Sequence, residues 1–124
     1  MAEVGSPAPY RLRYLPTGLV LVSVTRLVGT SRVDRRRGAT DHFAVYRTER
    51  NQPALTIAFE SAGHEPDAEP DTQINGLRVW CADGSRRRSV IAAGDDFILT
   101  LTASEFGPGA DALRGIVGGL ELPR

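Results

Sequence analysis

The stretch LRVWCADGSRRRSVIA, residues 77–92, carries the strongest evidence for the fold. Its first six residues alternate between two sets: Leu77, Val79 and Cys81 on one side, and Arg78, Trp80 and Ala82 on the other. Because successive side chains of a strand point to opposite faces, this alternation is typical of a strand with one apolar face. Asp83-Gly84 then predicts a tight turn, so residues 77–82 and 85–92 are expected to form an antiparallel hairpin.

Similar short runs lie on both sides of this hairpin. Residues 10–14 predict a short strand, residues 42–48 and 54–60 predict a second hairpin, and residues 97–102 predict a further strand. Residues 17–28 are rich in Val and Leu, and within them residues 19–22 are apolar on both faces of a strand. A strand of that kind has to be covered on both sides, so we expect a helix, a second sheet or a partner subunit against it.

The hydrophobic period changes near the C-terminus. Leu113, Ile116, Val117 and Leu120 are spaced i, i+3, i+4 and i+7, which predicts an amphipathic helix over residues 110–117. The glycines in and after this segment weaken an isolated helix, so docking against the sheet has to hold it. Six or seven strands followed by one helix predict an all-β fold, an antiparallel sandwich or small barrel, in a single domain of residues 1–124.

One segment of this domain differs from the rest. Residues 61–75 contain four acidic residues, two prolines and few apolar side chains, so they are expected to form a mobile acidic loop. His64 lies among these carboxylates. A mobile loop does not fix metal ligands against chain entropy, so we expect no metal site.

The composition excludes several functional classes. All 15 basic residues are arginines, which removes the lysine of a P-loop, a protein kinase or a Schiff base. One cysteine and two histidines cannot build an intrachain disulfide or a three-histidine zinc site, and no cofactor is expected. The 15 acidic residues balance the arginines, which argues against a membrane or a nucleic acid as partner. The N-terminus lacks the pattern of a signal peptide, so we expect a soluble cytoplasmic protein.

Arginine triplets at residues 35–37 and 86–88 lie either in solvated loops or at an anion site, and the second alternative makes them candidates for recognition. Guanidinium groups bind phosphate and carboxylate bidentately, so the expected ligand is an anionic small molecule or an acidic protein patch. Trp80 lies on the more polar face of its strand, where the indole either stacks on an arginine or is covered by the C-terminal helix. The predicted recognition face comprises Arg78, Trp80, Arg86, Arg87 and Arg88.

Two functional hypotheses follow. The first is a small binding or assembly module that uses this recognition face and forms a homo-oligomer through residues 19–22 or the C-terminal helix. The alternative is a cofactor-free β-barrel enzyme that performs acid-base or cyclisation chemistry on a small molecule in its lumen. Its candidate proton-transfer groups are His42, Tyr46 and Glu60. A filled core favours the first hypothesis, and a cavity lined by these three side chains favours the second.

Overall fold

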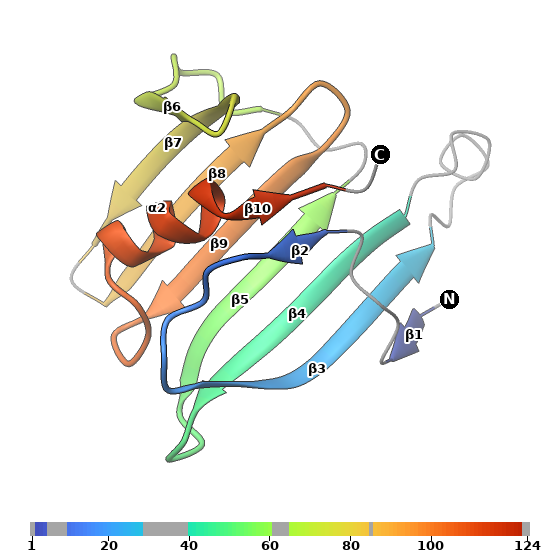
Figure 1. The fold of residues 1–124 in the computed structure, drawn as a ribbon, viewed down its shortest axis with the longest axis vertical. Helices are drawn as coiled ribbons and strands as arrows, with labels where there is room; N and C mark the ends of the chain where they lie inside the picture. Colours follow the sequence, from blue (N-terminus) through green and yellow to red (C-terminus); the bar gives the residue numbers. More distant parts are fainter. Residues whose placement is uncertain (1, 5–9, 29–39, 61–64, 85, 123–124) are drawn as a thin grey trace.

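The computed structural model describes residues 2–4, 10–28, 40–60, 65–84 and 86–122 of the chain (Figure 1). Eight of the described strands form one antiparallel sheet in the order β1-β3-β4-β5-β9-β8-β7-β6. These strands are β1 (Ala2–Val4), β3 (Leu19–Val28), β4 (Thr40–Thr48), β5 (Pro53–Glu60), β6 (Thr72–Ile74), β7 (Leu77–Asp83), β8 (Arg87–Ala93) and β9 (Ile98–Ser104). Two short strands, β2 (Arg11–Leu12) and β10 (Leu120–Glu121), pair in a separate ribbon, and α2 (Ala110–Gly118) precedes β10.

The predicted all-β class with a short C-terminal helix is confirmed, and the predicted helix 110–117 differs from α2 by one residue. The barrel alternative is wrong, because β1 and β6 lie at opposite edges of an open sheet. The described chain also contains short strands beyond those that the sequence predicts. Of these, β1, β6 and β10 contain only two or three residues each, too few to show a clear period.

The larger hydrophobic core lies on one face of the sheet. Ile57, Leu99 and Leu101 point to this face and are completely buried. The helix supplies Leu113, Ile116 and Val117 to the same cluster. Figure 1 shows α2 and the β2–β10 ribbon lying across this face, which we call the covered face, while the opposite side is the open face. Docking therefore holds a helix whose glycines would weaken it alone.

A smaller cluster lies on the open face, at the β7 side of the sheet. It contains Trp80, Ala93 and Ile98, with Ile91 packed against them. The Trp80 indole Nε1–H donates a hydrogen bond of 2.8 Å to the carbonyl of Ala68. Residues 65–71 therefore run close to the Trp80 ring, and we call this segment the acidic cap.

The acidic cap, which belongs to the segment that the composition predicts as a mobile loop, makes several contacts with β7. Asp71 accepts a hydrogen bond from the Cys81 backbone N–H at 2.7 Å, and its own N–H donates to the Val79 carbonyl at 2.8 Å. Glu65 pairs with Arg78. The chain then continues into β6, which pairs with β7, while residues 61–64 lie outside the described part. These contacts with β7 hold the acidic cap in place, although its mostly polar residues have little apolar surface to bury.

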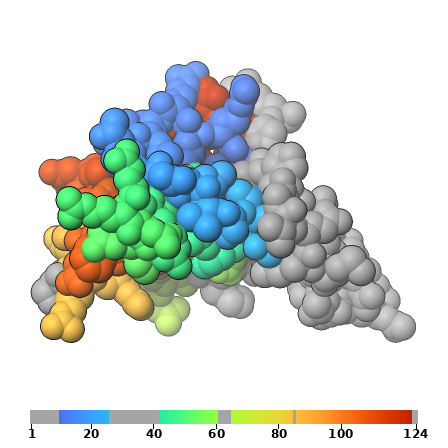
Figure 2. Space-filling view, turned by 90° about the horizontal axis from the view of Figure 1, so that it is seen from below, coloured from blue at the N-terminus to red at the C-terminus, as the bar shows by residue number. Residues whose placement is uncertain are grey.

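The strand β3 shows a second difference from expectation. Val20, Leu21 and Val22 are 49%, 51% and 54% exposed, so the expected cover of residues 19–22 on both faces is not present among the described residues. The pairing with β4 shifts register between Leu21 and Ser23, which makes Val22 an extra residue in a β-bulge. Figure 2, seen from the lower end of Figure 1, shows light-blue atoms of β3 at the surface beside the green β4–β5 hairpin.

Candidate functional site

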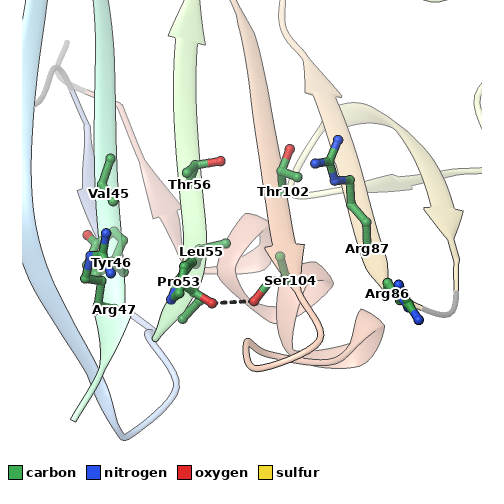
Figure 3. Close-up of a pocket in the computed structure, with 12 residues that line it drawn as sticks. Val45, Tyr46, Arg47, Pro53, Leu55, Thr56, Arg86, Arg87, Thr102 and Ser104 are labelled. Carbon is green, nitrogen blue, oxygen red and sulfur yellow. Dashed lines mark hydrogen bonds between the residues drawn. The ribbon is translucent and has the colours of Figure 1, made fainter. Parts of the chain in front are cut away.

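A pocket of about 270 Å³ lies at the end of the sheet where β4, β5, β8 and β9 run side by side. Figure 3 shows its lining side chains with α2 behind the sheet. Thr56 and Thr102 occupy the centre, while Arg47 and Arg87 lie toward its two sides. Arg86 lines the same pocket from the start of the β8 strand. We call this the arginine pocket.

Strand register explains why these side chains meet. Val45 pairs with Thr56, Thr56 with Thr102, and Thr102 with Ser89, so one row crosses four strands. Leu55, Ile57, Leu101 and Ala103 flank this row along the chain and are buried in the larger core. Alternation then directs both threonine side chains to the open face. The next row brings Arg47 opposite Pro53, and Arg87 opposite Ser104.

In the described part of the structure, no neighbouring carboxylate neutralises the charges of Arg86 and Arg87. Among the described residues, Arg86 and Arg87 form no ion pair, and Arg47 only donates from Nη1 to the Asn51 carbonyl at 3.0 Å. Four other arginines each pair with a carboxylate: Arg13 with Glu121, Arg78 with Glu65, Arg88 with Asp83 and Arg114 with Asp111. The arginine pocket therefore concentrates positive charge on a chain with no net charge.

The hydroxyl groups of the pocket differ in their hydrogen bonding. The Ser104 hydroxyl donates to the Pro53 carbonyl and accepts from the Phe106 N–H at 3.1 Å, which ties the end of β9 to the start of β5. Within the described part of the chain, the Thr56 and Thr102 hydroxyls have no hydrogen-bond partner. Both are therefore available to donate to a ligand oxygen. Arginine forks beside free hydroxyl donors are typical of sites for phosphate or carboxylate groups.

The structure does not assemble the predicted recognition face as one surface. Arg86 and Arg87 line the pocket, but Trp80 is only 9% exposed and lies beneath the acidic cap. Arg78 is held by Glu65 and by the Gly94 carbonyl at 3.2 Å. Arg88 points to the other face, toward Asp83 and the Pro108 carbonyl. The triplet at residues 35–37 lies outside the described residues.

Part of the reasoning behind that face is confirmed. Trp80 belongs to the small open-face cluster, whereas Leu77, Val79 and Cys81 pack against the larger core on the covered face. Trp80 lies opposite Ile91, and no arginine stacks on its ring among the described residues. The covering element is the acidic cap and not the C-terminal helix.

The candidate proton-transfer groups do not share one pocket. His42 and Tyr46 are buried on the covered face. Glu60 is exposed and pairs with Ile98, so its side chain points to the open face. Burial raises the pKa of the Tyr46 hydroxyl above its ordinary value, which makes this group a weaker acid. These three side chains are therefore not brought together in the described part of the structure.

A second cavity, of about 430 Å³, lies between α2 and the outer end of β7 and β8. Cys81, Arg88 and Arg114 line it, and Arg114 also pairs with Asp111. Hydrogen bonding to Cys81 is the largest of the contacts that raise the pKa of the Arg114 guanidinium. The carboxylates Asp83 and Asp111 contribute opposing charge here, so this cavity is a weaker anion site than the arginine pocket.

Sequence analysis missed Arg47, Thr56 and Thr102. The alternation in residues 54–60 places Thr56 opposite the apolar face, so the sequence did contain a signal for its orientation. The meeting of β5 with β9 has no comparable signal, because these strands pair over a long separation in the chain. Only that pairing brings the two threonines together.

Other kinds of site receive little support from the described residues. Among them, no group of three or more His, Cys, Asp or Glu side chains is placed to hold a metal ion. No helix in the described ranges is long and apolar enough to cross a membrane. Comparison with known protein families and with characterised proteins found no match for the chain. The functional argument therefore depends on the geometry and charge of the sites themselves.

Proposed function

We propose that this protein is a small binding module that takes the phosphate or carboxylate group of an anionic molecule in the arginine pocket. The observation that supports this proposal most directly is the absence of a carboxylate partner for Arg86 and Arg87 in the described part of the chain. Arg47 and Arg87 flank two free threonine hydroxyls, so a bound oxyanion can accept hydrogen bonds from both sides and from below.

The size of the pocket limits the ligand. Its volume of about 270 Å³ lies near the lower end of small-molecule sites, for which roughly 300–1,000 Å³ is typical. We therefore expect the pocket to enclose a single charged group, with the rest of the ligand lying along the open face. The roles are simple: the guanidinium groups bind the charge, and the hydroxyls of Thr56 and Thr102 select an oxygen-rich group over a halide.

Titration with phenyl phosphate tests this function, and backbone amide shifts in NMR spectra report the position of binding. We expect saturable shifts at residues of the arginine pocket, and Arg87→Gln should weaken binding about tenfold because one charge-assisted hydrogen-bond pair is lost. Inorganic phosphate and glutamate distinguish a phosphate preference from a general anion preference. Arg13→Gln is the control, since Arg13 pairs with Glu121 on the ribbon. Equal weakening by both variants, or shifts that never saturate, would contradict the proposal.

A further inference from the structure

We propose that two copies of this chain join edge to edge through β3 and form one continuous antiparallel sheet. The outer edge of β3 is largely vacant in the described structure. Within the described residues, its pairing with β1 covers only Thr25, Arg26 and Leu27, and residues 19–24 have a described strand neighbour on the β4 side alone. A strand edge of this kind presents unpaired backbone donors and acceptors, which template another strand.

The side chains at this edge of β3 favour pairing with another strand and do not block it. Proteins guard free edges with charged residues, prolines or bulges. Residues 19–24 contain no charge and no proline, and Val20, Leu21 and Val22 are about half exposed. When a second copy pairs at this edge, no like charges face each other, and the strand that it supplies is equally apolar.

The bulge at Val22 decides the register of the pair. In a regular strand, residues 19 and 24 would point to opposite faces, but the extra residue places Leu19 and Val24 both against the larger core. It likewise places Val20, opposite Arg47, and Ser23, opposite Val45, on the open face. A two-fold axis between Leu21 and Val22 therefore pairs residue 19 with 24 and 20 with 23, and every pair keeps a common face. The bulge, which would otherwise disturb an edge, lies at the symmetry axis.

The two-fold symmetry also places the two arginine pockets relative to each other. Their role as a pair rests on the proposed function. A two-fold axis perpendicular to the sheet leaves both open faces on the same side of the dimer. Arg47 lies on β4, directly beside β3, so three strand spacings separate the two copies of Arg47 across the interface. With the offset along the strands, the separation is about 17 Å. The dimer thus presents a pair of anion sites to a ligand or partner that carries two charged groups.

The expected dimer is weak. Six strand residues from each copy form an interface at the low end of specific complexes, below about 1,200 Å² in total, so we expect a concentration-dependent equilibrium. Sedimentation equilibrium of the full chain from micromolar to millimolar concentration should show the mass rising from 13.4 kDa toward twice that value. A mass that stays at that of one chain throughout this range overturns the proposal.

Variants test the interface and its register. Leu21→Lys places two like charges at the axis and should weaken dimerisation at least tenfold, while the half-exposed position allows the chain to fold. Phe106→Lys, at an exposed aromatic residue outside β3, is the control and should leave the dimer unchanged. Val20→Lys alone should weaken the dimer, and Val20→Lys combined with Ser23→Glu should restore it, because the new charges lie opposite each other. Failure of the double variant to restore dimerisation overturns the register.

The same variants separate this proposal from the proposed function. Monomeric Leu21→Lys should bind phenyl phosphate with unchanged affinity, whereas a probe with two phosphates about 17 Å apart should bind the parent dimer more tightly than this monomer. If the dimer forms but phenyl phosphate does not bind, the arginine pocket is not an anion site and the interface stands. If phenyl phosphate binds and the mass never rises, the interface fails alone.

Discussion

At the scale of single residues, the buried tyrosine hydroxyls give the protein a defined response to alkali. Burial raises the pKa of Tyr10 far above its ordinary value of 10.0, and the neighbouring Tyr46 raises it further. Burial also raises the pKa of Tyr46. Below pH 10 the folded and unfolded chains both keep these protons, so the two groups add no pH dependence. Above pH 10 the unfolded chain releases these protons more readily than the folded chain, so the free energy of unfolding must fall as the pH rises.

This effect has a measurable size. Each tyrosine should lower the free energy of unfolding by up to about 1.4 kcal/mol per pH unit above pH 10. Urea unfolding of the parent, Tyr10→Phe and Tyr46→Phe at pH 8, 10 and 11 measures it. Each substitution should make the alkaline loss shallower, even where the lost hydroxyl changes stability at pH 8. An unchanged slope in both variants would show that other groups cause the alkaline loss.

Single residues also show what the sequence pattern predicts and what it does not. Alternation correctly places Trp80 and Cys81 on opposite faces, because that is a property of the pleated backbone. It does not say what covers each face. The acidic cap reaches Trp80 through a carbonyl hydrogen bond, and a backbone carbonyl leaves no trace in the composition of a segment. The pattern therefore predicts the direction of the Trp80 side chain, but it does not identify the segment that covers the ring.

At the scale of elements, the acidic cap depends on one strand for its order. Its contacts run to β7 and its side chains: the Trp80 indole, the backbone at Val79 and Cys81, and Arg78. Each exposed ion pair contributes little, whereas the buried indole contributes packing as well as a hydrogen bond. The cap and the small open-face cluster should therefore be lost together when the ring is removed.

Trp80→Ala tests that dependence. Removing a large buried aromatic ring costs about 3–5 kcal/mol in the free energy of unfolding, which is a large part of the stability of a domain of this size. Chemical denaturation measures the loss, and faster amide exchange at Asp71 reports release of the cap. The matched control is Phe106→Ala, at an aromatic residue that is 47% exposed, with an expected cost of less than about 1 kcal/mol. Similar costs for both substitutions would mean that the indole is not packed as described.

Other elements differ in how far the sequence determines them. The helix α2 was predictable because its apolar residues follow one period over two turns. The β4–β5 and β7–β8 hairpins were predictable because each pair is joined by a short turn. The bulge in β3 was not, because an extra residue in a run of Leu and Val leaves the composition unchanged. That one residue reverses the faces that Ser23 and Val24 occupy.

At the scale of the whole molecule, the order of strands is the feature that the sequence leaves open. Leu55 pairs with Ala103 and Glu60 with Ile98, so β5 and β9 join the two halves of the chain in the middle of the sheet. Nothing local selects this pairing, since any two apolar strands of similar length could meet. The arginine pocket depends on it, because Thr56 and Arg47 come from one half and Thr102 and Arg87 from the other. The candidate site could therefore not be predicted beyond its separate pieces.

This arrangement predicts a gradient of amide hydrogen exchange across the sheet. The middle strands contain Ile57, Leu99 and Leu101, which are fully buried, so their amides should exchange only through global unfolding and be the slowest. In a dilute sample, the outward-facing amides of residues 19–24 should exchange rapidly because that edge has no described strand neighbour. Raising the protein concentration through the dimer range should slow these amides and leave those of β9 unchanged, since only the edge gains a partner. Slow exchange at residues 19–24 in the dilute sample would mean instead that one chain covers its own edge, and the sheet would then have no free strand to offer a second copy.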